Sequence, residues 1–89
     1  MLTQQVTIVN RLGLHARAAA KFVQTAAAFK CEIFVAKGSN KVNGKSIMGL
    51  MMLAASQGTT LELLTKGENE DGAMQALVAL IADRFGESE

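Results

Sequence analysis

The hydrophobic periodicity switches between two spacings along this chain, and that switching restricts the fold more than any other feature of the sequence. Residues 3–10 alternate, with Val6 and Ile8 on one face, which is typical of a half-buried strand. Residues 16–29 carry apolar side chains three and four positions apart, which predicts an amphipathic helix. The chain therefore combines strands and helices instead of building its core from one type of element.

The rest of the chain shows the same two kinds of signal. Further strands are predicted over residues 30–37, 41–43 and 59–66, and further helices over residues 47–55 and 70–85. Gly58 is interpreted as the C-cap of the shorter helix, Asn69 as the N-cap of the longer one, and residues 86–89 as a frayed tail. The order β-α-β-β-α-β-α favours an α+β fold, with helices on one face of a four-stranded antiparallel or mixed sheet. A ferredoxin-like sheet and an open-faced β-sandwich both fit this order.

Length and composition indicate one compact domain spanning residues 1–89. The formal net charge is +1, and four phenylalanines are the only aromatic residues, so neither charge nor base stacking favours nucleic-acid binding. The only cysteine, Cys31, has no partner for a disulfide or a cysteine-based metal site, and we interpret it as a small buried apolar residue.

Two further patterns bear on cellular location. Residues 1–10 lack the basic start and the continuous apolar stretch of a secretory signal. The longest apolar stretch, residues 47–55, contains Gly49 and is too short to span a bilayer. We therefore expect a soluble cytoplasmic protein that does not insert into membranes.

The only histidine, His15, lies where the first strand and its turn lead into the first helix. A helix N-terminus disfavours the charged imidazolium and so favours the neutral, nucleophilic ring. The backbone N–H groups of Ala16 and Arg17, with the Arg17 guanidinium, could bind the oxygens of a phosphate on this ring. The pattern predicts a phosphate-carrying histidine, and an ordinary surface histidine at a turn is the alternative that these residues alone leave open.

Other chemistry at His15 fits the sequence less well. No second histidine and no carboxylate lies near it in the sequence, so we expect no metal. No serine adjoins it, which disfavours acyl transfer. We also expect no cofactor.

A second unusual segment begins at Ser46, which we interpret as a helix N-cap. A phosphorylated serine at the start of a helix would also be stabilised. The helix that follows is apolar nearly all round, so Met48 falls on another face when Leu50 and Met51 face the core. Either this helix is buried on all sides, or its methionines form an exposed surface for partners.

Two motifs stand some thirty residues apart in this chain. The first reads Gly13-Leu14-His15-Ala16-Arg17, and the second reads Asn43-Gly44-Lys45-Ser46-Ile47-Met48. Together they resemble the HPr family, the histidine-containing phosphocarriers of the bacterial phosphoenolpyruvate-dependent phosphotransferase system, and the similarity extends over essentially the whole chain. The resemblance implies an open-faced β-sandwich, in which three helices cover one face of a four-stranded antiparallel sheet.

The resemblance also implies a phosphotransfer route. His15 would be phosphorylated on Nδ1 by the phosphohistidine of enzyme I and would pass the group to a histidine of an enzyme IIA domain. Ala16 and Arg17 would steady the phosphate. Such a protein is a carrier in sugar uptake or regulation and not an independent catalyst. Ser46 would be the site at which a dedicated kinase and phosphatase regulate the carrier.

The resemblance further implies a monomer with a docking surface beside His15. The implied docking residues are Leu14, Ala20, Gln24, Lys45, Ile47, Met48, Gly49 and Met51. Since Ile47, Met48 and Met51 would form its apolar part, the resemblance favours exposure of the short helix over its complete burial.

Two departures from the family pattern affect these expectations. Ala18 stands where the family usually has proline in the first helical turn, and we expect both the helix and phosphotransfer to survive this change. Few lysines surround the site, so docking should depend more on apolar contact than on charge.

Three alternative functions stay open. Within the family, the carrier could belong to a nitrogen-type regulatory branch that is not coupled to transport, although the segment 45–48 favours a serine-regulated carrier. Outside the family, the chain could be a non-covalent ligand-binding or interaction module. It could also be an oligomerising structural protein with the methionines in a permanent interface.

Overall fold

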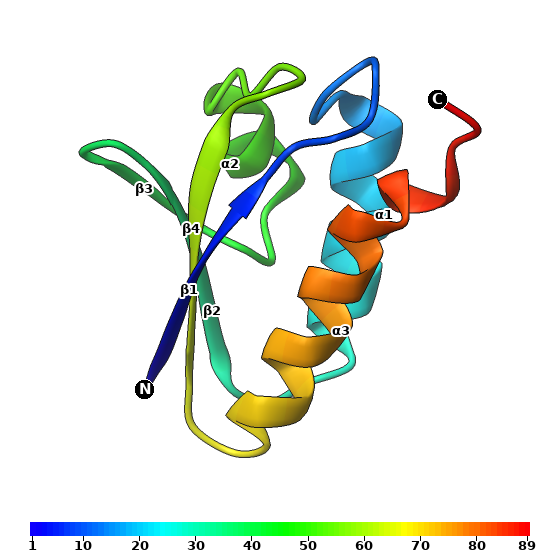
Figure 1. The fold of residues 1–89 in the computed structure, drawn as a ribbon. Helices are drawn as coiled ribbons and strands as arrows, with labels where there is room; N and C mark the ends of the chain where they lie inside the picture. The colour runs from blue at the N-terminus through cyan, green and yellow to red at the C-terminus, as the bar shows by residue number, and fades with distance from the viewer.

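The computed structural model describes all of residues 1–89, which form four strands and three α-helices (Figure 1). The strands are β1 (Leu2–Thr7), β2 (Glu32–Lys37), β3 (Asn40–Asn43) and β4 (Thr60–Lys66). The helices are α1 (Ala16–Ala27), α2 (Ile47–Met52) and α3 (Glu70–Ala82), and a short 3₁₀ turn covers Arg84–Gly86. The predicted order of elements is confirmed. None of the helices combines the length and the apolar character that crossing a membrane requires.

The strands form one antiparallel sheet in the order β1-β4-β2-β3. Val6 of β1 lies opposite Leu61 of β4, and Val35 of β2 lies opposite Leu63 of β4. The strand order excludes the ferredoxin-like alternative, because that fold pairs its first and third strands in the centre of the sheet, whereas here β1 and β3 lie at opposite edges. The helices cover one face of the sheet (Figure 1), so the open-faced β-sandwich is confirmed.

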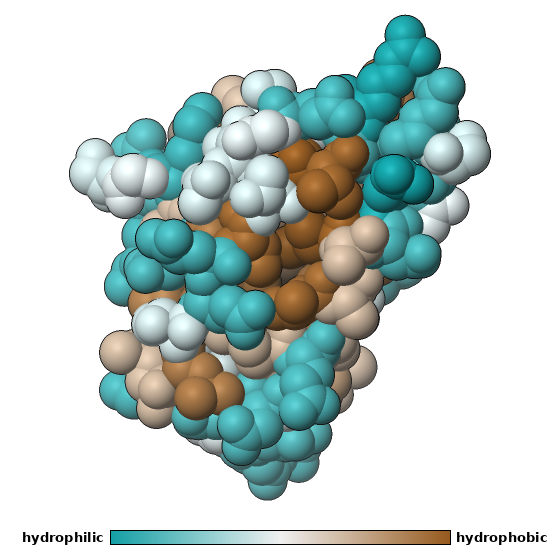
Figure 2. All heavy atoms as spheres, viewed as in Figure 1, coloured by the Kyte–Doolittle hydropathy of each residue, from teal (hydrophilic) through white to brown (hydrophobic).

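The hydrophobic core lies between the sheet and the helices. Ile33 and Val35 alternate with more exposed residues along β2 and are fully buried, as a half-covered sheet requires. Phe22 of α1 is also buried, and such burial contributes roughly 1.5–3 kcal/mol. Figure 2, in the same view as Figure 1, shows apolar residues in the middle of the visible surface with hydrophilic residues around them. Ala18 is fully buried within α1, which confirms that the helix forms without the proline usual in the family.

The C-terminal segment is bonded to the rest of the protein, and the prediction of a frayed tail is wrong. α3 ends at Ala82, before the predicted end, and Phe85 beyond it is fully buried with a left-handed backbone (φ +54°). The Arg11 N–H group donates to the carbonyl oxygen of Glu89 at 2.9 Å, and the two side chains form an ion pair at 3.0 Å. The polar sequence of the tail gives no local signal for these contacts, because they depend on residues far away along the chain.

The predicted C-cap of α2 is also corrected. α2 ends at Met52, so Gly58 lies well beyond the helix. Gly58 instead turns the chain into β4 with φ +90°, and its N–H group donates to the carbonyl oxygen of Ile8 at 2.8 Å. Glycine with a left-handed backbone occurs both in turns and at the ends of helices, so the sequence around Gly58 does not show which of the two is formed.

Asn69 occupies the N-cap position of α3 as predicted, but it does not cap the helix with its side chain. Its backbone is left-handed (φ +56°), and the side chain makes no capping hydrogen bond. The Glu70 carboxylate instead accepts from the Gly67 N–H group at 2.9 Å and pairs with the terminal ammonium of Met1 at 3.1 Å. These two partners lower the pKa of the Glu70 carboxyl below its ordinary value.

Candidate functional site

His15 occupies the N-cap position of α1, at the end of a tightly held loop. Its backbone is extended (φ −80°, ψ −179°), and helical residues follow from Ala16. The Leu14 N–H group donates to the carbonyl oxygen of Ala55 at 2.8 Å, which ties this loop to the segment after α2. Gly13 has φ +71°, and a Cβ there would lie 2.5 Å from the same carbonyl oxygen, so the position requires glycine. The loop therefore presents His15 from a well-defined backbone.

The imidazole of His15 is held through one ring nitrogen only. Nε2 forms a hydrogen bond with the carboxylate of Glu87, from the C-terminal segment, whereas Nδ1 has no hydrogen-bond partner. The same carboxylate accepts a hydrogen bond from Nδ2 of Asn10 at 3.0 Å. The His15 side chain is 26% exposed. Nδ1 is therefore the nitrogen that can take a new group without breaking a contact.

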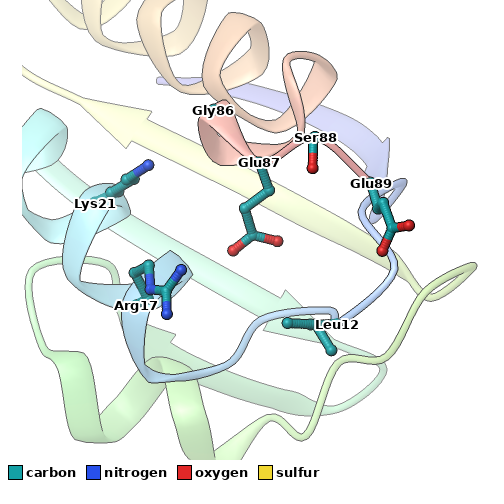
Figure 3. A pocket seen from close by; sticks show the side chains of 7 residues that line it. All are labelled: Leu12, Arg17, Lys21, Gly86, Glu87, Ser88 and Glu89. Atoms are coloured by element: carbon teal, nitrogen blue, oxygen red, sulfur yellow. The ribbon is translucent and has the colours of Figure 1, made fainter.

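The surroundings of Glu87 favour its ionised form. Partial burial raises the pKa of the Glu87 carboxyl, whereas hydrogen bonds from Asn10 and His15 lower it. The charges of a protonated His15 and of Arg17 add to this lowering, so the pKa lies below its ordinary value. Arg17 and Lys21 of α1 and Glu87 of the tail line a hollow of about 430 Å³. Figure 3 shows the side chains of these three residues. A carboxylate and two cations thus share the surface beside the histidine.

The start of α1 offers hydrogen-bond donors next to the ring. No side chain caps this helix, and Ala16 and Arg17 are both exposed. The first N–H groups of a helix have no partner within it. Together with the Arg17 guanidinium, they can bind the oxygens of an anion attached to His15. No cluster of three metal-binding side chains occurs in the protein.

Ser46 begins α2, and its predicted role as N-cap is confirmed. Its Oγ accepts a hydrogen bond from the Gly49 N–H group at 3.0 Å. Next to it, Nζ of Lys45 donates to the carbonyl oxygen of Phe29 at 2.6 Å, which connects this segment to the chain after α1. The capping serine is partly exposed.

One side of α2 forms an exposed apolar surface, which we call the methionine patch. It consists of Ile47, Met48, Met51 and Met52, with 41%, 74%, 44% and 80% of their surface exposed. Leu50 is the only buried residue of this helix. Burial of the helix on all sides is therefore excluded and the exposure of its methionines is confirmed, whereas their role as a surface for partners stays a prediction.

The other predicted docking residues differ in exposure. Gln24 is exposed, and Ala20, Lys45 and Gly49 are partly exposed. Leu14 is only 6% exposed and packs in the hydrophobic core. Its assignment to a docking surface is corrected, because the turn of the loop at Gly13 directs this apolar side chain inward.

Two residues of the site, Asn10 and Glu87, are absent from the sequence-based candidates. They lie 77 positions apart and meet only in the folded chain. The local pattern places Asn10 at a strand end and Glu87 in a polar tail, and neither position signals a contact with His15. The one available hint is Phe85, an aromatic residue that a frayed tail would leave exposed.

Comparison with known proteins gives the class to which this open-faced sandwich belongs, the phosphocarrier proteins. Residues 2–83 match the family described as "PTS HPr component phosphorylation site". The chain belongs to the HPr family, the phosphocarrier proteins of the phosphotransferase system.

Individual relatives cover the full length of the chain. It is 60% identical to the phosphocarrier protein HPr of Neisseria meningitidis serogroup A over 89 residues, covering 100% of both chains. It is 56% identical to HPr of Pseudomonas aeruginosa over 86 residues, or 96% of each. Among solved structures, HPr-C-His from Thermoanaerobacter tengcongensis superimposes with a TM-score of 0.96, at 49% identity and with 100% of both chains covered.

Proposed function

We propose that His15 accepts a phosphoryl group at Nδ1 from the phosphohistidine of enzyme I and passes it to a histidine of an enzyme IIA domain. The observation that carries this proposal is the asymmetry of the ring, because Nε2 is bound to Glu87 and Nδ1 has no partner. Residues 1–89 would act as a single cytoplasmic carrier domain, without catalysing a reaction of their own.

The transfer needs no cofactor and no change in redox state. The Nδ1 lone pair of a neutral His15 attacks phosphorus, and the bond between phosphorus and the donor's nitrogen breaks. The donor nitrogen takes back the electron pair of that bond. The same reaction, run with His15 as the donor, delivers the group to the acceptor histidine.

The start of α1 supplies the stabilisation that this chemistry requires. The N–H groups of Ala16 and Arg17 and the Arg17 guanidinium would bind the three phosphoryl oxygens. Because these donors lie at an exposed helix end, they steady the group without enclosing it. A carrier must release its phosphate to the next protein, and an open site is consistent with that requirement.

Ile47, Met48 and Met51 of the methionine patch would be the apolar part of a docking surface shared by both partners. Methionine side chains are flexible and polarisable, so one patch can fit several partner surfaces. The rest of this surface would comprise the polar Gln24 and Lys45 with the small residues Ala20 and Gly49, which are all at least partly exposed. This surface joins two elements, because Ala20 and Gln24 belong to α1 whereas Lys45 and Gly49 belong to the α2 segment.

Ser46 would be a regulatory phosphorylation site for a serine kinase and phosphatase. Ser46 is partly exposed and stands directly before the methionine patch. A phosphate on Ser46 would place about two negative charges at the edge of an apolar docking surface. Such a charge would weaken docking through desolvation, which makes inhibition the expected direction of the regulation.

We propose a monomer in solution. A solved HPr of Thermoanaerobacter tengcongensis is described as a dimer and superimposes with a TM-score of 0.78 at 50% identity. Size-exclusion chromatography with light scattering at two concentrations decides between the two states. A dimer mass that is independent of concentration would contradict the proposal and favour the methionine patch as a permanent interface.

The central experiment incubates the purified protein with phosphoenolpyruvate and enzyme I, and follows intact mass and phosphorus NMR. We expect one acid-labile phosphoryl group per chain, absent from His15→Ala and retained by the matched control Ser46→Ala. A folded wild-type protein that takes no phosphoryl group, even from the enzyme I of its own genome, would overturn the proposal and favour the non-covalent module.

A further inference from the structure

Asn10 is a fully buried polar side chain whose two amide hydrogens both have partners. Nδ2 donates to the carbonyl oxygen of Gly13 at 2.8 Å and to Oε1 of Glu87 at 3.0 Å. Both partners are acceptors, so hydrogen-bond chemistry requires the NH₂ group to face them. Oδ1 on the other side of the amide is buried without a partner. The unsatisfied oxygen destabilises the fold, and the two hydrogen bonds that Nδ2 donates offset this penalty.

These contacts fix the Glu87 carboxylate at both of its oxygens. One oxygen accepts from Asn10, and the other forms the hydrogen bond with Nε2 of His15. The Glu87 side chain is only 13% exposed, although it belongs to a segment of polar sequence. The buried Phe85 holds the segment on one side of it.

We propose that Asn10 and Glu87 are positioning residues for phosphoryl transfer: the amide of Asn10 holds the Glu87 carboxylate against Nε2 of His15, so that the ring keeps its proton on Nε2 and its lone pair on Nδ1. The inference rests on the proposed function of His15. It adds a reason why one ring nitrogen and not the other would react.

The chemistry explains why a carboxylate helps in both directions of transfer. Before transfer, the Nε2–H group donates to the carboxylate, which selects the tautomer with a free lone pair on Nδ1. When Nδ1 bonds to phosphorus, the ring becomes positively charged, and the carboxylate on Nε2 compensates that charge. The proton stays on Nε2 throughout, so the ring leaves as a neutral imidazole when the phosphoryl group moves on. The arrangement works as the aspartate of a serine-protease triad does, by orienting a histidine without taking its proton.

The test compares Glu87→Gln with Glu89→Gln as the matched control. Both variants neutralise one carboxylate of the same tail, but Glu89 pairs with Arg11 at an exposed position and does not contact the histidine. Asn10→Asp is the second variant, because it keeps the shape of the side chain and removes both donated hydrogens. Circular dichroism and thermal unfolding establish that each variant is folded.

Two readouts separate positioning from a merely structural role. The first is the ring Nε2–H proton in NMR spectra at about pH 8, where an ordinary histidine is neutral. We expect a protected downfield signal in wild type and Glu89→Gln, and its loss in Glu87→Gln and Asn10→Asp. The second is the rate of phosphorylation by enzyme I and phosphoenolpyruvate, which should fall roughly tenfold in the same two variants. The double variant should be no slower than Glu87→Gln alone, because both residues act through one contact.

The outcomes distinguish this inference from the proposed function. Normal phosphorylation of Glu87→Gln, with the Nε2–H signal unchanged, would overturn the positioning role and leave His15 as the carrier. Failure of the wild-type protein to accept a phosphoryl group would overturn the proposed function, and this inference with it. An equal loss of rate in Glu89→Gln would also overturn it, since the effect would then arise from charge in the tail and not from the contact.

Discussion

The Leu14 N–H group donates a 2.8 Å hydrogen bond to the carbonyl oxygen of Ala55, and this bond joins the loop before His15 to the segment after α2. The histidine and the methionine patch are therefore carried by two parts of the backbone that are bonded to each other. Gly13 makes this approach sterically feasible, because it has no side chain to meet Ala55.

Gly13→Ala tests this close contact. The new Cβ would lie 2.5 Å from the Ala55 carbonyl oxygen on a backbone with φ +71°. We expect the free energy of unfolding to fall by about 2–4 kcal/mol, because left-handed strain alone costs about 1–3 kcal/mol and the steric contact adds to it. Urea denaturation measures the change. The control is Gly38→Ala, also left-handed but with open space around it, which should lose only about 1 kcal/mol.

Ser46→Ala removes the side-chain acceptor that caps α2. The Gly49 N–H group would lose its 3.0 Å partner, and we expect a loss of about 1 kcal/mol in stability. Ser46→Asp keeps a capping oxygen and should be within about 0.5 kcal/mol of wild type. Thermal unfolding followed by circular dichroism compares the three proteins. Equal stability of the two variants would show that the hydrogen bond contributes nothing.

Met48→Lys tests docking without disturbing the fold. Met48 is 74% exposed, so the free energy of unfolding should change by less than about 0.5 kcal/mol. A charge in an apolar docking surface should raise the apparent KM for transfer from enzyme I roughly tenfold. Steady-state phosphotransfer at several carrier concentrations gives this value. Met52→Lys, at a similarly exposed position outside the predicted docking residues, should raise the apparent KM less than Met48→Lys does. A larger effect of Met52→Lys would mean that the docking surface includes Met52 instead of Met48.

Protonation of the Glu87 carboxylate should lower the free energy of unfolding in acid. Its carboxyl pKa lies below the ordinary value of 4.5, owing to Asn10 and the cationic His15 and Arg17, so the unfolded chain binds the proton first. This stabilisation is fully present above pH 4.5 and is lost as the pH falls through the lowered pKa. Urea denaturation from about pH 6 to pH 3 should therefore show a shallower decline for Glu87→Gln than for wild type. Glu89→Gln should follow the wild-type curve, and a Glu87→Gln curve parallel to wild type would contradict the assignment.

The core of the fold and the central histidine could be predicted from the sequence because their signals are local. Apolar residues alternate along β2 and β4 and recur at helical spacing along α1, because these are the side chains that face the core. Val35, Leu63 and Phe22 are examples, and all three are buried. The N-cap at Ser46 is local too, because the acceptor and its donor Gly49 are three residues apart. Such patterns depend on a few neighbouring residues, so the local structure can be predicted without knowing how the rest of the chain folds.

The sequence by itself therefore determined the order of elements, the α+β class, the histidine at the start of α1 and, through two motifs, the family. Only the tertiary structure decided which ring nitrogen of His15 is free, because its other nitrogen meets Glu87, 72 positions away. The same holds for the burial of Leu14 and Phe85, and for the difference between a turn and a cap at Gly58. Each of these depends on contacts between segments distant in sequence, and local periodicity carries no information about which distant segments will meet.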